Sequence, residues 1–415
     1  MHRRRVTTLA VAVVTALVAG APIADAAFPG DTGAVAWSVI PAAGTTWQIH
    51  TMTIYGTDDT ALTSGPQGAR NPAWSPDGLR IAFDRPGVGN GDVWTMQADG
   101  SQAEDLTEGP DTELAPAWSP DGSRIAFLAR HDGAWSLRVM WSDGSRVRRL
   151  VVLNGVSGGP PSWSPRGSEI AFTDLRAGSM DILVLDLRTG KIRDLTPGAG
   201  NERDVDWSPD GRQLAYSSDG AGDPDIYRIR ADGTHPVRLT SSTALDVAPA
   251  WSPDASRIVF VRTRGTGDAD LMTMNALTGS PAAILTSARD QDLMPSIQPL
   301  CTVVGTSGAD TLVGTSGPDV ICGLGGDDQI RAGPGADVVF GARGDDTVSG
   351  GGGNDVLVGG AGSDIVRGQK GMDLASGRDR VGGNDIFQGG PGYDECVVDT
   401  GDELGSCSFV TVGFP

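Results

Sequence analysis

The segment from Asn71 to Asp84 reads NPAWSPDGLRIAFD, and four later segments repeat its pattern. They read APAWSPDGSRIAFLA from Ala115, PPSWSPRGSEIAFTD from Pro160, DVDWSPDGRQLAYSS from Asp204 and APAWSPDASRIVFVR from Ala248. The five tryptophans, at positions 74, 118, 163, 207 and 251, are spaced by 44, 45, 44 and 44 residues. A constant period of this length is typical of an array of small β units rather than of one irregular domain.

Each repeat predicts four short strands. The first surrounds the tryptophan, and Ser-Pro-Asp-Gly then supplies a type I turn, which prefers Pro at its second and Gly at its fourth position. An apolar second strand follows, as at Arg80–Phe83, and then a third, as at Asp92–Met96. A fourth strand ends in Leu-Thr, as at Leu106-Thr107. Four strands in about 44 residues indicate one blade of a β-propeller.

The two ends of the array predict how the ring closes. Segments Ala34–Ile40, Trp47–Ile54 and Thr60–Thr63 provide a second, third and fourth strand, but no Trp-Ser-Pro segment precedes them. Met294–Pro299 follows the last full repeat and carries Ile297 in the tryptophan position. We expect this segment to supply the missing first strand, which closes a six-bladed ring and removes its free edges. The alternative is an open solenoid.

These repeats resemble the WD40-like (PD40) β-propeller repeat of the TolB family, whose signature is close to AWSPDGxxIAF. The resemblance covers nearly all of residues 33–300, with Arg166 and Ala255 as departures in individual turns. It implies a propeller of the kind that serves as a periplasmic protein-binding scaffold, or as the non-catalytic propeller of some peptidases. A fold of this kind supports a binding role without naming the partner.

Beyond residue 300 an aspartate recurs every nine residues. A Gly stands two residues before each of the first eight, and a small or apolar residue stands two residues after it, from Leu312 to Ala375. A three-residue insertion then precedes two further repeats. The ten aspartates are Asp310, Asp319, Asp328, Asp337, Asp346, Asp355, Asp364, Asp373, Asp385 and Asp394. The eight glycines are Gly308, Gly317, Gly326, Gly335, Gly344, Gly353, Gly362 and Gly371.

This order of residues predicts a calcium site. Glycine permits tight turns with positive φ, so that backbone carbonyls converge. Aspartate adds hard oxygen ligands, which suit calcium rather than a transition metal. The block resembles the hemolysin-type (RTX) calcium-binding repeat, GGxGxDxUx, over about 93 residues. The resemblance implies a parallel β-roll in which two nonapeptides make one turn, and in which these aspartates and glycines hold several Ca²⁺ ions, about six in all. Arg380-Val381 departs from it before Asp385.

The repeated aspartates also predict that the β-roll needs calcium in order to fold. Without calcium, stacked carboxylates repel, and one inward apolar side chain per repeat cannot offset the entropy of the chain. We therefore expect residues 301–415 to be largely disordered until calcium binds.

All four cysteines lie in the second part of the chain, at 301, 322, 396 and 407. Four cysteines allow three pairings. We favour Cys301–Cys322 and Cys396–Cys407, because each pair brackets one end of the nonapeptide array. Disulfides of this kind are typical of exported proteins.

The amino terminus predicts export. Residues 1–27 contain three consecutive arginines, an apolar stretch and an Ala-Asp-Ala cleavage signature, which together are typical of a signal peptide. The expected domains are therefore a signal peptide (1–27), a propeller (28–300) and a disulfide-capped β-roll (301–415), in a secreted, all-β protein. No later segment is apolar enough to span a membrane. The net charge of −20 argues against a nucleic-acid partner.

Catalytic motifs are weak. The three histidines after residue 27 lie in different blades, at 50, 131 and 235. Gly155–Gly159 matches Gly-x-Ser-x-Gly, but no helix is expected after it, as a nucleophile elbow requires. Glu113, Glu202 and Asp246 each stand five residues before a tryptophan, where they either line the channel or are solvated loop charges. We favour a calcium-binding protein whose propeller engages a protein or cell-envelope partner. The alternative is a secreted hydrolase with its site in the channel.

Overall fold

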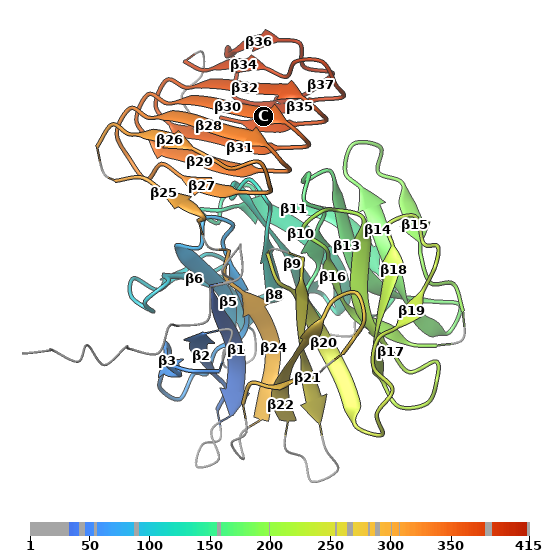
Figure 1. The fold of residues 1–415 in the computed structure, drawn as a ribbon. Helices are drawn as coiled ribbons and strands as arrows, with labels where there is room; N and C mark the ends of the chain where they lie inside the picture. The colour runs from blue at the N-terminus through green and yellow to red at the C-terminus, as the bar shows by residue number, and fades with distance from the viewer. Residues whose placement is uncertain are drawn as a thin grey trace, which may run out of the picture.

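The computed structural model describes residues 33–412, except 41–45, 54–55, 87–90, 156–158, 199, 254, 264–268, 281–282, 287–290, 300, 307 and 378–383. Every regular element of the described residues is a β-strand, and the strands run from β1 to β37. They form a propeller and a parallel β-roll, which lies across one end of the propeller (Figure 1). The predicted signal peptide, residues 156–158 of the Gly-x-Ser-x-Gly match and Arg380-Val381 lie outside the described residues.

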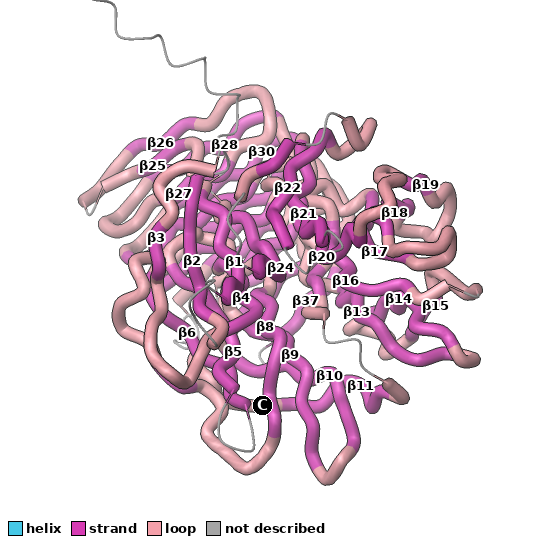
Figure 2. Tube along the Cα trace, turned by 90° about the horizontal axis from the view of Figure 1, so that it is seen from below, coloured by secondary structure: helices cyan, strands magenta, loops and turns pink. Residues whose placement is uncertain are grey.

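Four blades are separate, four-stranded antiparallel sheets. Each begins with the tryptophan strand at the centre and continues outward in chain order (Figure 2). The first two are β4 (Arg70–Trp74), β5 (Arg80–Pro86), β6 (Gly91–Gln97) and β7 (Glu104–Asp105), then β8 (Thr112–Trp118), β9 (Arg124–His131), β10 (Ala134–Trp141) and β11 (Arg148–Leu153). The next two are β12 (Ser162–Trp163), β13 (Glu169–Arg176), β14 (Ser179–Asp186) and β15 (Ile192–Asp194), then β16 (Glu202–Trp207), β17 (Gln213–Ser218), β18 (Asp225–Arg230) and β19 (Val237–Arg238).

The remaining eight strands form one sheet, in two sets of four. One set is β20 (Leu245–Trp251), β21 (Arg257–Thr263), β22 (Ala269–Asn275) and β23 (Ala283–Ile284). The other is β24 (Gln291–Ile297), β1 (Ala34–Ile40), β2 (Gln48–Thr53) and β3 (Thr60–Ala61). The carboxy-terminal strand β24 pairs with β1, with Ile297 opposite Val35, as expected for the closing strand. The prediction of six separate blades is wrong, because Ala269 of β22 lies opposite Gln291 of β24 and joins the two sets.

The central strands bend at a repeated β-bulge. The residue three positions before the tryptophan has positive φ in four repeats, and Met294 has it in the closing strand. The pairing register shifts at the same place, for example between Leu114 and Ala117. A bulge of this kind bends a strand and increases its twist. Pro160 occupies the equivalent position in the third segment, where proline cannot adopt positive φ, and β12 is only two residues long.

The propeller core lies between blades rather than within one. In one cluster Ala82 and Val93 of one blade pack against Ile125 and Phe127 of the next. Another joins Val259 and Leu271 to Val35, Trp37 and Ile297, across the point where the chain closes on itself. Each blade therefore buries its apolar side chains against its neighbours, as a closed ring requires.

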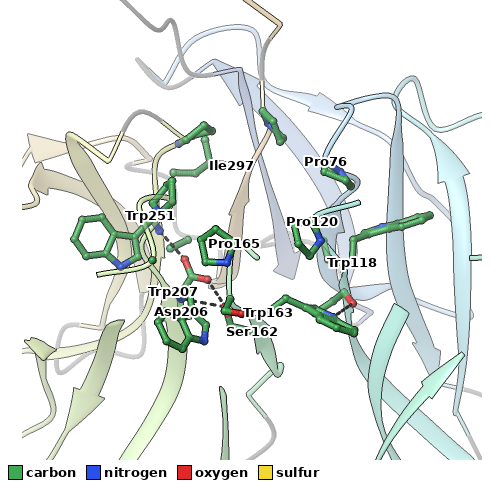
Figure 3. A pocket seen from close by; sticks show the side chains of 18 of the residues that line it. Pro76, Trp118, Pro120, Ser162, Trp163, Pro165, Asp206, Trp207, Trp251 and Ile297 are labelled. Carbon is green, nitrogen blue, oxygen red and sulfur yellow. Dashed lines mark hydrogen bonds between the residues drawn. The ribbon is translucent and has the colours of Figure 1, made fainter. Parts of the chain in front are cut away.

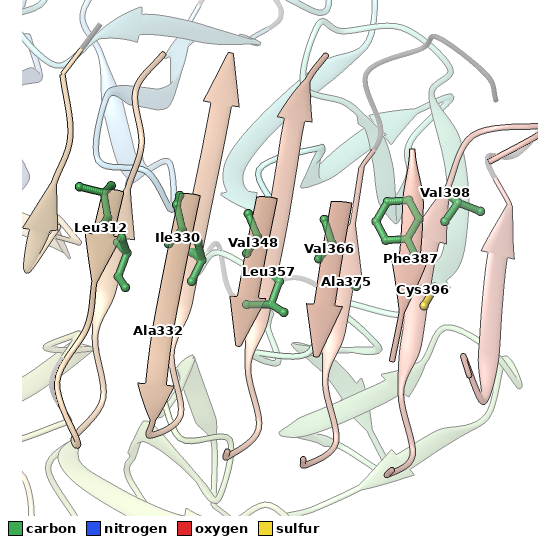
Figure 4. Packing of buried hydrophobic residues seen from close by; sticks show 12 residues of the cluster. Leu312, Ile330, Ala332, Val348, Leu357, Val366, Ala375, Phe387, Cys396 and Val398 are labelled. Atoms are coloured by element: carbon green, nitrogen blue, oxygen red, sulfur yellow. The ribbon is translucent and has the colours of Figure 1, made fainter. Parts of the chain in front are cut away.

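The β-roll consists of two parallel sheets that take alternate nonapeptides. One sheet is β25 (Val303–Val304), β27 (Val320–Cys322), β29 (Val338–Arg343), β31 (Val356–Ala361), β33 (Leu374–Ser376), β35 (Glu395–Val398) and β37 (Phe409–Val412). The other is β26 (Thr311–Val313), β28 (Gln329–Pro334), β30 (Thr347–Gly352), β32 (Ile365–Lys370), β34 (Ile386–Gln388) and β36 (Glu403–Gly405). The side chains two residues after each aspartate point between the sheets (Figure 4). They include Ile330, Val339, Val348, Leu357, Val366 and Phe387, and each is at most 1% exposed.

None of the described residues belongs to a helix long and apolar enough to cross a membrane.

Candidate functional site

The ten aspartates form two columns along the roll. One column precedes the strands of the β26 sheet and contains Asp310, Asp328, Asp346, Asp364 and Asp385. The other precedes the strands of the β27 sheet and contains Asp319, Asp337, Asp355, Asp373 and Asp394. The insertion after Gly377 does not break the first column, since the backbone nitrogen of Asp364 donates to Oδ1 of Asp385 at 2.8 Å. The structure thus keeps Asp385 in register despite the sequence departure before it.

Within a column, each aspartate after the first accepts a hydrogen bond from the preceding turn through one carboxylate oxygen. The backbone nitrogen of Asp328 donates to Oδ1 of Asp346 at 2.8 Å, and that of Asp337 to Oδ1 of Asp355 at 3.0 Å. Equivalent bonds connect every successive pair of turns from Asp310 and from Asp319 onward. Oδ1 is therefore a structural acceptor that fixes the orientation of the carboxylate.

The second oxygen, Oδ2, has no hydrogen-bond partner in most of the later repeats. This holds for buried Oδ2 atoms of Asp328, Asp337, Asp346, Asp355, Asp373 and Asp394. Burial, together with neighbouring carboxylates of the same column, raises the pKa of Asp346 and of Asp355 to about 7. A buried carboxylate oxygen without a partner is costly unless a cation compensates for it. The row of Oδ2 atoms is therefore the strongest candidate for a cation site.

The first two repeats differ because threonine satisfies their aspartates. Oδ2 of Asp319 accepts from the backbone nitrogen of Thr315 at 2.6 Å and from its hydroxyl at 2.9 Å. Thr306 makes the same two bonds to Asp310. In the later repeats this position has positive φ, for example +107° at Gly333. Asp310 and Asp319 therefore lack the orphaned oxygen that the later aspartates have.

Glycines before the aspartates leave space for oxygen atoms in most repeats. A Cβ on Gly341, five residues before Asp346, would collide with Oδ2 of Asp346 and with the carbonyl oxygen of Gly359. Gly353 has φ of +146°, and a Cβ there would collide with the carbonyl oxygen of Gly335 in the turn below. A Cβ would collide with the turn below at Gly326, Gly335, Gly344, Gly353, Gly362 and Gly371, whereas at Gly308 and Gly317 the nearest atom would be a threonine hydroxyl 3.9 Å away. Glycines five residues before an aspartate, such as Gly341, line the space beside its Oδ2.

This arrangement fits a calcium ion. The space beside each unpartnered Oδ2, called the cradle below, offers a carboxylate oxygen and nearby backbone carbonyl oxygens. Calcium prefers hard oxygen ligands of this kind. Among the described residues no three His, Cys, Asp or Glu side chains gather in one place. A site here would therefore combine a carboxylate with main-chain oxygens, as the nonapeptide pattern predicts.

Two disulfides close the ends of the roll. Cys301 is bonded to Cys322, and Cys396 to Cys407. This is the pairing favoured from the sequence. Cys322 and Cys396 lie on strands β27 and β35, so each bond attaches a terminal segment to the roll.

The second candidate region is a cavity of about 850 Å³ at the centre of the propeller (Figure 3). The first-strand segments of all the repeats line it with tryptophan and proline, and Ile297 of β24 completes the circle. Asp206 is its best-defined polar group (Figure 3), since its carboxylate accepts from Ser162 Oγ at 3.0 Å and from the backbone nitrogen of Trp251 at 2.8 Å. These bonds hold three blades together and occupy both of its oxygens.

The acids that the sequence offered as channel candidates do not line this cavity. Glu113, Glu202 and Asp246 lie on the central strands, at most 7% exposed, so they are not solvated loop charges either. Asp246 forms an ion pair with Arg262 at 2.6 Å, and Ser218 donates to Glu202 at 2.8 Å. Asp246 and Glu202 are thus bonded within their blades, whereas Oε2 of Glu113 is buried without a hydrogen-bond partner.

The nonapeptide pattern does not single out Thr306 and Thr315, which bond to Asp310 and Asp319. The available signal was a Gly-Thr-Ser-Gly segment in place of Gly-Gly at residues 305–308 and 314–317. A threonine there can bond back to its own aspartate, whereas glycine cannot.

Fold and site together define a class, a β-propeller built from tryptophan repeats and joined to a nonapeptide β-roll of the calcium-binding type. The model of the TolB β-propeller domain matches residues 7–151 and 113–307, and the chain belongs to this family. The model of the RTX calcium-binding nonapeptide repeat matches residues 304–339, 331–366 and 340–374.

Solved structures show the same propeller fold. TolB from Acinetobacter baumannii is 23% identical, with a TM-score of 0.57, over 66% of this chain and 68% of that one. A putative TolB from Agrobacterium tumefaciens is 24% identical, with a TM-score of 0.51, over 65% of this chain and 92% of that one. Hydrazine synthase from Kuenenia stuttgartiensis is 15% identical, with a TM-score of 0.55, over 65% of this chain and 47% of that one. No curated protein gave a significant match.

Proposed function

We propose that this chain is an exported calcium-binding protein whose β-roll holds several Ca²⁺ ions and whose propeller is a scaffold for a protein or cell-envelope partner. One observation carries the calcium proposal: the buried Oδ2 atoms of Asp328, Asp337, Asp346, Asp355, Asp373 and Asp394 have no hydrogen-bond partner. The match to the RTX repeat supports it independently.

The ions would be held by the later repeats. Asp328, Asp337, Asp346, Asp355, Asp373 and Asp394 are the proposed carboxylate ligands, and Asp364 and Asp385 continue the first column. Asp310 and Asp319, which threonine already satisfies, would serve as structural caps instead. Glycine carbonyls beside each Oδ2 would complete the coordination.

The proposed domains are a signal peptide (1–27), the propeller (28–300) and the roll (301–415). Export is supported by the disulfides and by the calcium repeats, because both are stable outside the reducing, calcium-poor cytosol. A scaffold role is supported by membership of the TolB propeller family. For the hydrolase alternative, Asp206 does not supply a free acid at the cavity, since both of its oxygens are engaged within the fold.

The experiment is calcium titration of the chain from residue 28, by isothermal titration calorimetry, with far-UV circular dichroism in parallel. We expect several ions per chain and a gain of β signal from the roll as calcium is added. A chain that binds no calcium at millimolar concentration, with the same spectrum in chelator, would contradict the proposal.

A further inference from the structure

The two outer faces of the roll differ in polarity. Residues one and three positions after each aspartate point outward, because side chains alternate along a strand. On the β27 sheet these positions include Val338, Val356, Leu374 and Phe340, of which the last three are at most 7% exposed. On the opposite sheet they include Gln329, Arg331 and Ser349, and Val313 is 59% exposed. One face is therefore covered, and the other is in contact with solvent.

The propeller covers the apolar face. Phe340 and Val358 line a small space of about 170 Å³ together with Pro76, Leu79 and Asp121, which belong to the Ser-Pro-Asp-Gly turns of two blades. Leu374 approaches Gly167 of a third turn, where a Cβ would lie 3.7 Å from its Cδ2. At the far end of the roll the guanidinium of Arg188 lies 5.2 Å from the centre of the Phe409 ring.

Arg166, in the same turn as Gly167, is the residue by which this third turn departs from Ser-Pro-Asp-Gly. In three of the other turns the aspartate accepts from the serine two residues before it, as Asp77 does from Ser75 at 2.6 Å. Arg166 cannot make that bond, but its Nη1 lies 3.5 Å from Sδ of Met372 on the roll. Burial raises the pKa of Asp373, and the positive charge of Arg166 partly counteracts this rise. Arg166 thus contacts the roll in place of the bond that aspartate makes within the turn.

The same contact closes the propeller cavity. Its lining includes the tryptophan and proline segments of the propeller and also Val338, Asp355, Val356 and Met372 of the roll. The roll thus stands across the mouth where the Trp-Ser-Pro turns meet (Figure 1).

We propose that the β-roll is a calcium-assembled lid, which covers this mouth when calcium is bound and uncovers it when calcium is lost. The proposal rests on calcium binding by the roll. Val338, Val356 and Leu374 each directly follow a proposed ligand aspartate, so the repeats that hold the ions also present the apolar face. A roll that unwinds without calcium loses the parallel strands that keep these side chains on one surface.

Peptide-resolved hydrogen exchange on the chain from residue 28 tests this in calcium and in chelator. In chelator, amides of the 75–80 and 119–124 turns should exchange about tenfold faster or more. The β9–β10 hairpin, which turns at the other end of the propeller, should be unchanged.

A matched pair of variants separates docking from calcium binding. Phe340→Asp places a charge on the covered face, and Val313→Asp places one at the equivalent, exposed position of the other sheet. Phe340→Asp should expose both turns even in calcium, with unchanged ion stoichiometry by calorimetry, and Val313→Asp should not. If the Phe340→Asp variant does not form the β-roll, the milder change Phe340→Ala should still expose the two turns in part.

Turns that stay equally protected in chelator and in Phe340→Ala, while the wild-type roll binds and releases calcium, would overturn the lid. A chain that binds no calcium at all would instead refute the proposed function, so the two failures are distinguishable.

Discussion

The backbone nitrogen of Asp337 donates a hydrogen bond to Oδ1 of Asp355, 3.0 Å away and one full turn further along the roll. The bond uses one carboxylate oxygen and directs the other, Oδ2, into a buried space where it has no partner. Asp355 therefore has one oxygen that accepts a structural hydrogen bond and one that remains for a cation, and the same holds for Asp328, Asp337, Asp346, Asp373 and Asp394. Asparagine separates these roles, since it keeps the acceptor and replaces Oδ2 with an amide nitrogen.

Asp355→Asn should weaken calcium binding while the roll still winds at high calcium. The acceptor for Asp337 is retained, but a charged ligand is lost, and calcium affinity depends on ligand charge. We expect the midpoint of the calcium titration to rise by roughly tenfold, equivalent to about 1.4 kcal/mol. The measurement is isothermal titration calorimetry.

Asp345→Asn is the matched control for this change. Asp345 is exposed, and its Oδ1 accepts from the backbone nitrogen of Ser363 at 2.8 Å, so the substitution removes the same charge outside the cradle. Equal losses of affinity in the two variants would show that net charge, rather than Oδ2, controls binding.

Asp319→Asn should affect stability more than calcium affinity. Both oxygens of Asp319 are near donors of its own or a neighbouring turn, with Thr315 bonded to Oδ2 at 2.6 and 2.9 Å. An amide nitrogen at that position faces the backbone nitrogen of Thr315 as a second donor, which costs about 1–3 kcal/mol. Urea denaturation at saturating calcium should show this loss, with a calcium midpoint within about twofold of wild type. A tenfold shift in that midpoint would place an ion at the second repeat.

The tryptophan and nonapeptide periods predicted both parts of the fold because each local signal recurs in phase. The closing strand followed from the same logic, and Ile297 lies opposite Val35 as expected. The single pair Ala269–Gln291 that joins two blades was not predictable, since neither residue differs from its surroundings in any repeated way. Positive φ at Ala115 and Ala248 was equally hidden, because alanine carries no preference for that conformation.

The calcium candidates were predictable as residues but not as atoms. Spacing identified the aspartates, whereas the different roles of Oδ1 and Oδ2 depend on the stacking of turns eighteen residues apart. The contact of Arg166 with Met372 depends on how two repeat arrays dock across 206 residues of sequence. Periodicity within either array contains no information about that docking.

Replacing Cys396 and Cys407 together by serine should destabilise the carboxy-terminal end of the roll. The disulfide closes a short loop and anchors the segment that leads to β37. The loss of chain restriction in the unfolded state predicts a decrease of about 3 kcal/mol in the free energy of unfolding. Urea denaturation in saturating calcium, followed by far-UV circular dichroism, measures it. An unchanged midpoint would mean that strand pairing alone fixes this end.

Asp206 predicts a pH dependence of propeller stability. Burial raises its pKa to about 6, although Trp251 and Ser162 donate to it, so the folded state disfavours the charged form. Its contribution to stability is therefore fully present below about pH 4 and is lost as the pH rises through about 6. A shift of about two units corresponds to about 3 kcal/mol between these limits.

Asp206→Asn should remove this dependence. The free energy of unfolding, measured by urea denaturation at intervals from about pH 4 to pH 8, should decrease with pH less steeply in the variant than in wild type. Asp99→Asn is the control, because Asp99 lies on an exposed turn where hydrogen bonds from Ser101 lower its pKa. Asp99 affects stability only at more acidic pH, so the free energy of unfolding of Asp99→Asn should change between pH 4 and 6 as it does in wild type. A wild-type slope in Asp206→Asn would mean that another buried acid, such as Glu113 with a pKa raised to about 7 by burial, dominates this range.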